Sequence, residues 1–85
     1  MKRNMDTVRR ILQAFEDYED GGLFEDRCPA SLAEDINEDS YVVLYHMKLL
    51  LDAGYLIPDT SPRYWTQGLT MKGHDLLDQI RDQAL

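Results

Sequence analysis

Two histidines, a single cysteine and one candidate serine are the side chains that could support metal or nucleophilic chemistry. His46 and His74 fall in different segments, and neither lies in the HxxxH or HExxH spacing that puts two ligands on one helix face. Cys28 has no second cysteine as a partner. Neither Cys28 nor Ser40 shows the sequence of a sharp turn that presents a catalytic nucleophile. The sequence therefore predicts no enzyme, no metal site and no cofactor.

The composition is that of a small globular protein. The 85 residues provide one modest hydrophobic core, so we expect a single domain over residues 1–85. Hydrophobic residues make up 44% of the chain and charged residues 29%. A lone cysteine fits a reducing compartment, and no apolar run approaches the length of a membrane span. We therefore expect a cytoplasmic protein with no membrane contact, and nothing indicates a small-molecule ligand.

The first half of the chain has the pattern of two helices. Apolar residues at three- and four-residue steps predict a helix over residues 5–19, capped by Asn4 and ended by the glycines at 21 and 22. Its inward face holds Met5, Val8, Ile11, Leu12, Phe15 and Tyr18. Residues 21–30 form a connector that could include a short strand. Ser31 and Glu34 then have the spacing of a capping box, which predicts a short helix with Leu32 and Ile36 inward.

The second half predicts a helix, a hairpin and a last helix. Asp39 or Ser40 can cap a helix that runs to residue 53 and stops at Gly54. This helix is apolar around most of its circumference, so we expect it to be central. Residues 55–57 and 64–66 favour strands and are separated by turn residues. Thr70 caps a final helix whose inward face holds Leu76, Leu77, Ile80 and Ala84.

This order of elements predicts a mainly α fold with a small β-hairpin, the winged helix-turn-helix (α-α-α-β-β-α). Three blocks also resemble a family of small bacterial and phage proteins known only as a domain of unknown function. They are residues 1–12 (MKRNMDTVRRIL), 45–57 (YHMKLLLDAGYLI) and 69–82 (LTMKGHDLLDQIRD). The resemblance implies a winged-helix fold and frequent occurrence in mobile elements, but no activity. The chain departs from the family at Met71, where Trp is common, and at Leu76, where an aromatic residue is common.

The charge balance bears on the partner. The formal net charge is −7, from 16 acidic and 9 basic residues, which disfavours unspecific attraction to nucleic acid. Acidic pairs recur through the first half, at residues 16–17, 19–20, 25–26, 34–35 and 38–39. Such pairs are typical of a solvated surface. They could also dock on a basic or nucleic-acid-handling protein, or imitate phosphates.

Two functions remain open for the winged-helix surface. The first is a non-catalytic module that binds a protein, anchored by Tyr41, Val42, Tyr45, Tyr64 and Trp65, with Glu38 and Asp39 at its acidic edge. The second is a DNA-binding regulator with Tyr41, Tyr45, His46 and Lys48 in the groove and Arg63 at the wing, which a homodimer could support by clustering its cations. Because two carboxylates lead this helix, we favour the protein partner. Simpler roles also exist: His46 could bond a carbonyl at the core edge, His74 could pack on a neighbouring element, and Tyr64 and Trp65 could cover the core.

Overall fold

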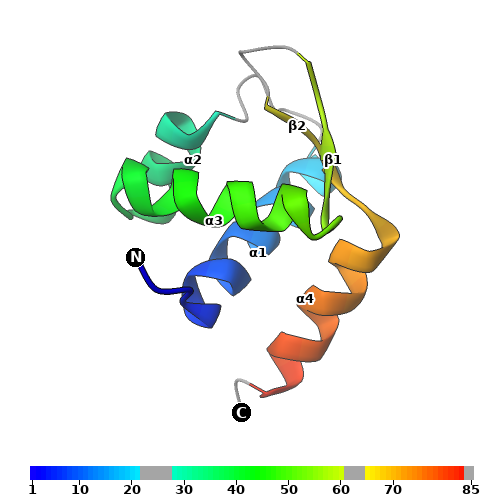
Figure 1. Ribbon diagram of the computed structural model, residues 1–85. Coiled ribbons are helices and arrows are strands. Elements are labelled where there is room, and N and C mark those ends of the chain that lie inside the picture. The colour runs from blue at the N-terminus through cyan, green and yellow to red at the C-terminus, as the bar shows by residue number, and fades with distance from the viewer. Residues whose placement is uncertain (22–27, 61–64, 84–85) are drawn as a thin grey trace.

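The computed structural model of the protein describes residues 1–21, 28–60 and 65–83. Four helices and a two-stranded antiparallel hairpin follow one another in the order α-α-α-β-β-α (Figure 1). This confirms the predicted winged-helix layout. The elements are α1 (Met5–Gly21), α2 (Pro29–Ile36), α3 (Ser40–Asp52), β1 (Leu56–Pro58), β2 (Thr66–Leu69) and α4 (Met71–Gln83). None of these helices is long and apolar enough to cross a membrane.

Local capping explains where three of the helices begin. The Asn4 side chain accepts hydrogen bonds from the backbone N–H groups of Asp6 (2.9 Å) and Thr7 (3.3 Å) at the start of α1. Asp39 accepts from the N–H of Tyr41 (2.8 Å) at the start of α3. The Thr70 hydroxyl accepts from the N–H of Gly73 (2.9 Å) at the start of α4. Each contact satisfies a donor that has no partner within its helix, and all three caps are confirmed.

The end of α3 is also as expected. Gly54 follows the helix with a φ of +84°, a conformation that costs glycine little. Its N–H donates to the carbonyl of Leu51 (3.2 Å), and the N–H of Tyr55 donates to that of Leu50 (2.9 Å). These bonds use carbonyls that the last turn leaves open, and the chain then turns directly into β1.

The capping box predicted for α2 is wrong. The helix begins at Pro29 with Cys28 in the N-cap position, so Ser31 already lies within the first turn. Proline needs no backbone donor and has a helical φ, which makes it well suited to the first helical position. Leu32 is fully buried as predicted, whereas Ile36 is only partly buried. The strand considered for residues 21–30 falls largely on residues 22–27, outside the described part of the chain.

The hairpin lies slightly later in the chain than predicted. Leu56 pairs with Leu69 and Ile57 with Gly68, so β2 continues to Leu69 instead of ending at Thr66. The physical reason is burial, because the facing side chains of Leu56 and Leu69 are only 1% and 5% exposed. The Thr66 hydroxyl donates to the carbonyl of Ile57 (2.6 Å) and holds the two strands together where the register shifts.

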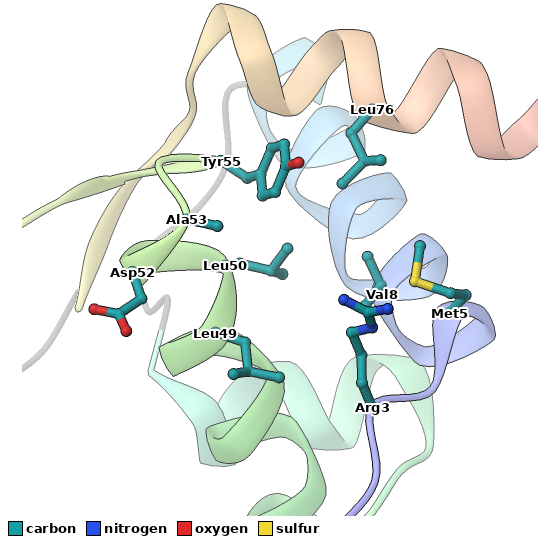
Figure 2. Close-up of a pocket in the computed structure, with 9 residues that line it drawn as sticks. All are labelled: Arg3, Met5, Val8, Leu49, Leu50, Asp52, Ala53, Tyr55 and Leu76. Atoms are coloured by element: carbon teal, nitrogen blue, oxygen red, sulfur yellow. The ribbon is translucent and has the colours of Figure 1, made fainter.

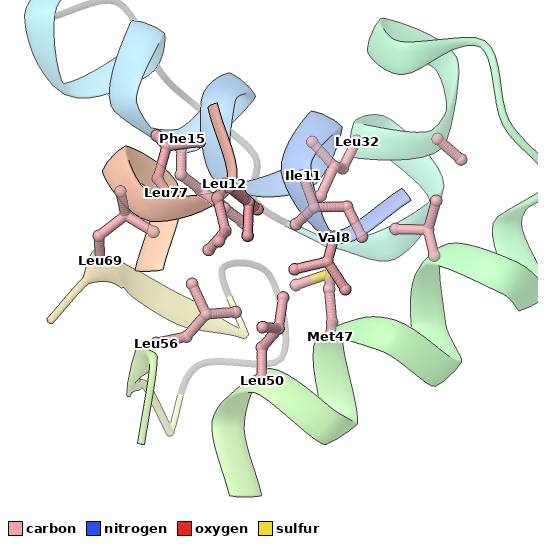
Figure 3. Close-up of a cluster of buried hydrophobic side chains, with 13 residues drawn as sticks. Val8, Ile11, Leu12, Phe15, Leu32, Met47, Leu50, Leu56, Leu69 and Leu77 are labelled. Atoms are coloured by element: carbon pink, nitrogen blue, oxygen red, sulfur yellow. The ribbon is translucent and has the colours of Figure 1, made fainter. Parts of the chain in front are cut away.

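The core lies between the four helices and the hairpin (Figure 3). It is formed by Val8, Ile11, Leu12, Phe15, Leu32, Ala33, Val43, Met47, Leu50, Leu56, Leu69, Leu77 and Ile80. We expected α3 to be the central helix, but α1 contacts more elements: it packs against α2, α3, α4 and β2, whereas α3 packs against α1, α2 and β1. The sequence of α1 does not reveal how many elements it contacts, because several of its polar side chains bond to neighbouring elements rather than to solvent. Met5 also departs from its predicted inward place and is 42% exposed.

Candidate functional site

The α2–α3 corner is the part of a winged helix that commonly meets a partner. Asn37 turns the chain between the two helices with a φ of +55°. Arg10 of α1 fixes this corner by donating to the carbonyl of Ile36 (2.9 Å) and to the carboxylate of Glu38 (2.8 Å). Arg10 therefore ties the corner to α1, and these two contacts help to fix the orientation of α3.

Two carboxylates occupy the N-terminal end of α3. Asp39 caps the helix, and Glu38 accepts from the backbone N–H of Asp39 (2.9 Å) while also pairing with Arg10. The Asp39 N–H and the Arg10 guanidinium hold the pKa of Glu38 below its usual value. Both residues thus stabilise the fold locally. The first turn of α3, where free N–H groups would attract a phosphate, already carries negative charge.

The outward face of α3 carries two tyrosines and a lysine. Tyr41 is 74% exposed, and Lys48 is exposed two turns further on. Tyr45 lies between them and is partly buried, as is Val42 beside Tyr41. The spacing of Tyr41, Tyr45 and Lys48 places them on one helix face. This face offers aromatic area and one cation, with Asp52 exposed at its far end.

His46 points to the core instead. Its ring is only 1% exposed, and both of its nitrogens are engaged. Nδ1 is 2.7 Å from the carbonyl oxygen of Val42, and Nε2 accepts from the backbone N–H of Asn4 at 2.9 Å. This contact agrees with the expectation that His46 bonds a carbonyl at the edge of the core. A contact between His46 and a DNA base would require the ring to leave the core.

The wing is only partly described. Arg63 and Tyr64, two of the candidate contact residues, lie outside the described residues. Trp65 packs partly buried against the core with a φ of +60°, and its carbonyl accepts from the N–H of Asp59 (3.3 Å). This position agrees with the interpretation that Trp65 covers the core.

Many of the acidic side chains have partners within the molecule. Glu16 accepts from Arg81 (3.0 Å), and Glu19 accepts from the backbone N–H of Leu69 (3.1 Å). His74 lies between the two glutamates, 3.6 Å from Glu16 and 3.1 Å from Glu19, so it packs on a neighbouring element as expected. These contacts join α1 to α4 and to β2. Much of the acidic character of α1 therefore supports the fold.

The described residues do not form a metal centre. Among residues 1–21, 28–60 and 65–83, no group of three or more His, Cys, Asp or Glu side chains could hold a metal ion. Cys28 is a partly buried free thiol whose Sγ donates to the Ser31 hydroxyl at 3.4 Å. The contact belongs to the start of α2.

Comparison with known proteins adds the family. A profile of the family described as "Hypothetical protein (DUF2513)" matches residues 2–85. The chain belongs to this family. This family assignment agrees with the resemblance to a domain of unknown function that residues 1–12, 45–57 and 69–82 show. The chain is also 36% identical, over 92 residues, to an uncharacterized protein of Haemophilus influenzae. That match covers 100% of this chain and 72% of the relative. No solved structure matches the chain.

A hollow that the sequence pattern does not predict lies beside the C-terminal end of α3. The hollow has a volume of about 440 Å³ and lies between the start of α1, the end of α3 and α4 (Figure 2). Arg3 and Met5 line it from the N-terminal side, and Tyr55 and Leu76 from the other. Met5 has the spacing of an inward residue of α1, yet it is exposed at the rim of this hollow. Helical spacing alone does not reveal this exposure.

Proposed function

We propose that this protein is a non-catalytic winged-helix interaction module that binds a protein partner through the outward face of α3. The observation that carries the proposal is the pair of carboxylates at the start of α3. In a helix-turn-helix that reads DNA, this end approaches the phosphates and base edges. Here Asp39 and Glu38 occupy it, and both are tied into the fold by hydrogen bonds.

The side chains on this face also suit a protein surface. Tyr41 is 74% exposed, and aromatic side chains supply much of the energy of protein interfaces. Tyr45 packs its ring edge-on against the His46 ring, with 5.1 Å between the ring centres, so it is held in place before any partner arrives. A rigid aromatic anchor loses little conformational freedom on binding. We expect the partner to bury Tyr41 and the exposed part of Tyr45.

Photo-crosslinking tests this proposal directly. A photoreactive phenylalanine analogue at position 41 should give a discrete protein adduct in cells that carry the gene. The same analogue at Gln79, an exposed position on α4, is the matched control and should give none. Tyr41→Ala should leave the melting temperature unchanged and abolish capture of the partner identified from the adduct. Equal adducts at positions 41 and 79 would contradict the proposed surface.

DNA binding is the second candidate, and one observation favours it. Arg3, Lys48 and Lys72 have no ion pair with any described residue, and Lys48 lies on the same face as Tyr41. A regulator would show a clear shift of random duplex DNA at about 50 mM salt, with a steep loss of affinity as salt rises. Lys48→Ala would then lower the salt slope by about one. We expect no shift at micromolar protein.

We also propose a cytoplasmic location, which the single cysteine and its free thiol support. Fractionation of cells that carry the gene tests this.

A further inference from the structure

The hollow beside the end of α3 has the size and lining of a small-ligand site. Its volume of about 440 Å³ falls within the range of ligand pockets, about 300–1,000 Å³. The walls come from residues far apart in the chain, and most of them are apolar: Met5, Val8, Leu49, Leu50 and Leu76. Met5 is 42% exposed, so this apolar wall meets solvent.

Two polar groups face this apolar lining. Figure 2 shows the Arg3 side chain extending from the N-terminal segment along the hollow, and the Tyr55 hydroxyl directed towards the side of Leu76. No hydrogen bond or ion pair joins either group to another described residue. The Asp52 carboxylate also borders the hollow but points away from Arg3 and from the apolar wall (Figure 2). The group available for an ion pair inside the hollow is therefore a guanidinium.

A second cation reinforces the positive charge at one edge. Lys72 lies with its Nζ 4.6 Å from the centre of the Tyr55 ring, and it donates to the carbonyl of Ala53 at 2.9 Å. Ala53 itself lines the hollow. In contrast, Arg10 and Arg81 are neutralised by carboxylates elsewhere on the molecule. A protein with a net charge of −7 thus keeps Arg3 and Lys72 without ion pairs among the described residues beside its apolar hollow.

We propose that this hollow binds a small organic carboxylate with an apolar body. The Arg3 guanidinium pairs with the carboxylate, since its planar donors match the two carboxylate oxygens. The apolar body lies against Met5, Leu49 and Leu76, which removes apolar surface from water. The site is separate from the Tyr41 surface, so this inference stands independently of the proposed partner.

Titration of the full chain with octanoate tests the proposal, with octanamide as the neutral probe of the same length. We expect saturable shifts of the backbone amide signals of Val8, Leu50 and Tyr55 with octanoate. Octanamide should bind at least about tenfold more weakly, because it lacks the charge that Arg3 recognises. Equal affinity for the two probes would overturn the proposal, as would octanoate shifts confined to other residues or no saturable shift at millimolar octanoate.

Matched variants separate the ion pair from general attraction. Arg3→Gln should weaken octanoate binding about tenfold and leave octanamide binding unchanged. Lys2→Gln removes a neighbouring exposed cation that does not line the hollow, and it should change octanoate binding less than twofold. Equal effects of the Arg3 and Lys2 substitutions would show that net charge alone attracts octanoate, which contradicts a built site.

Discussion

His46 in α3 accepts a hydrogen bond from the backbone N–H of Asn4, the residue whose side chain caps α1, at a distance of 2.9 Å. An acceptor at Nε2 must be unprotonated, so the ring is neutral and its proton lies on Nδ1, facing the carbonyl of Val42 at 2.7 Å. One buried ring therefore joins the start of the chain to the helix that carries the candidate surface.

His46→Leu tests this link, because leucine fills similar space without an acceptor. The Asn4 N–H then loses its partner, and we expect the free energy of unfolding to fall by about 1–3 kcal/mol in urea denaturation. In the native protein, long-range proton–nitrogen NMR spectra should show His46 with its proton on Nδ1. A proton on Nε2, or a His46→Leu protein as stable as the original, would contradict the link.

Gly73 allows α4 to approach the turn between α3 and β1 closely. A Cβ atom at this position would lie 2.1 Å from the carbonyl oxygen of Tyr55, a backbone atom that also accepts from the N–H of Thr70. Alanine usually stabilises a helix relative to glycine by about 1 kcal/mol. Here we expect the opposite sign, a loss of about 1–3 kcal/mol, because the backbone must shift. Gln79→Ala on the exposed side of α4 is the control, and thermal unfolding measures both. A stabilised Gly73→Ala protein would contradict the close approach.

The hydrogen bonds of Glu38 predict part of the loss of folding stability at low pH. The Asp39 N–H and Arg10 hold the Glu38 pKa below its ordinary 4.5. The stabilisation is therefore fully present above this value and is lost as the pH falls through the lower pKa of the folded state. Glu38→Gln should flatten the fall in stability below about pH 4.5, as followed by urea denaturation at a series of pH values. An unchanged fall in the Glu38→Gln protein would argue against the Glu38 contacts.

Truncation of side chains on the inward face of α3 should lower the folding stability strongly. Met47 and Leu50 are 0% and 4% exposed, so Met47→Ala or Leu50→Ala should cost about 2–5 kcal/mol, enough to unfold a marginal domain. Tyr41→Ala, on the opposite face, should change stability by less than about 0.5 kcal/mol. Circular dichroism during heating measures all three. An unchanged melting temperature for Met47→Ala would contradict the orientation of α3.

The amino-acid sequence alone determined the features that depend on near neighbours in the chain. Asn4, Asp39 and Thr70 cap helices because their side chains reach N–H groups two or three residues away, and Gly54 ends α3 because of its own backbone freedom. Helical spacing likewise predicted the burial of Val8, Ile11, Leu12 and Phe15. The capping pattern at Ser31 was misleading, because Pro29 begins the helix two residues earlier.

Only the tertiary structure decided which distant groups meet. Arg10 has no sequence signal that assigns it to Glu38, and Arg3 has none that assigns it to the hollow beside Tyr55. The sequence left His46 either in a DNA groove or at the core edge, and the fold buried it against the N-terminal segment. These outcomes depend on how the helices cross and pack, because the crossing brings residues together that lie dozens of positions apart in the chain.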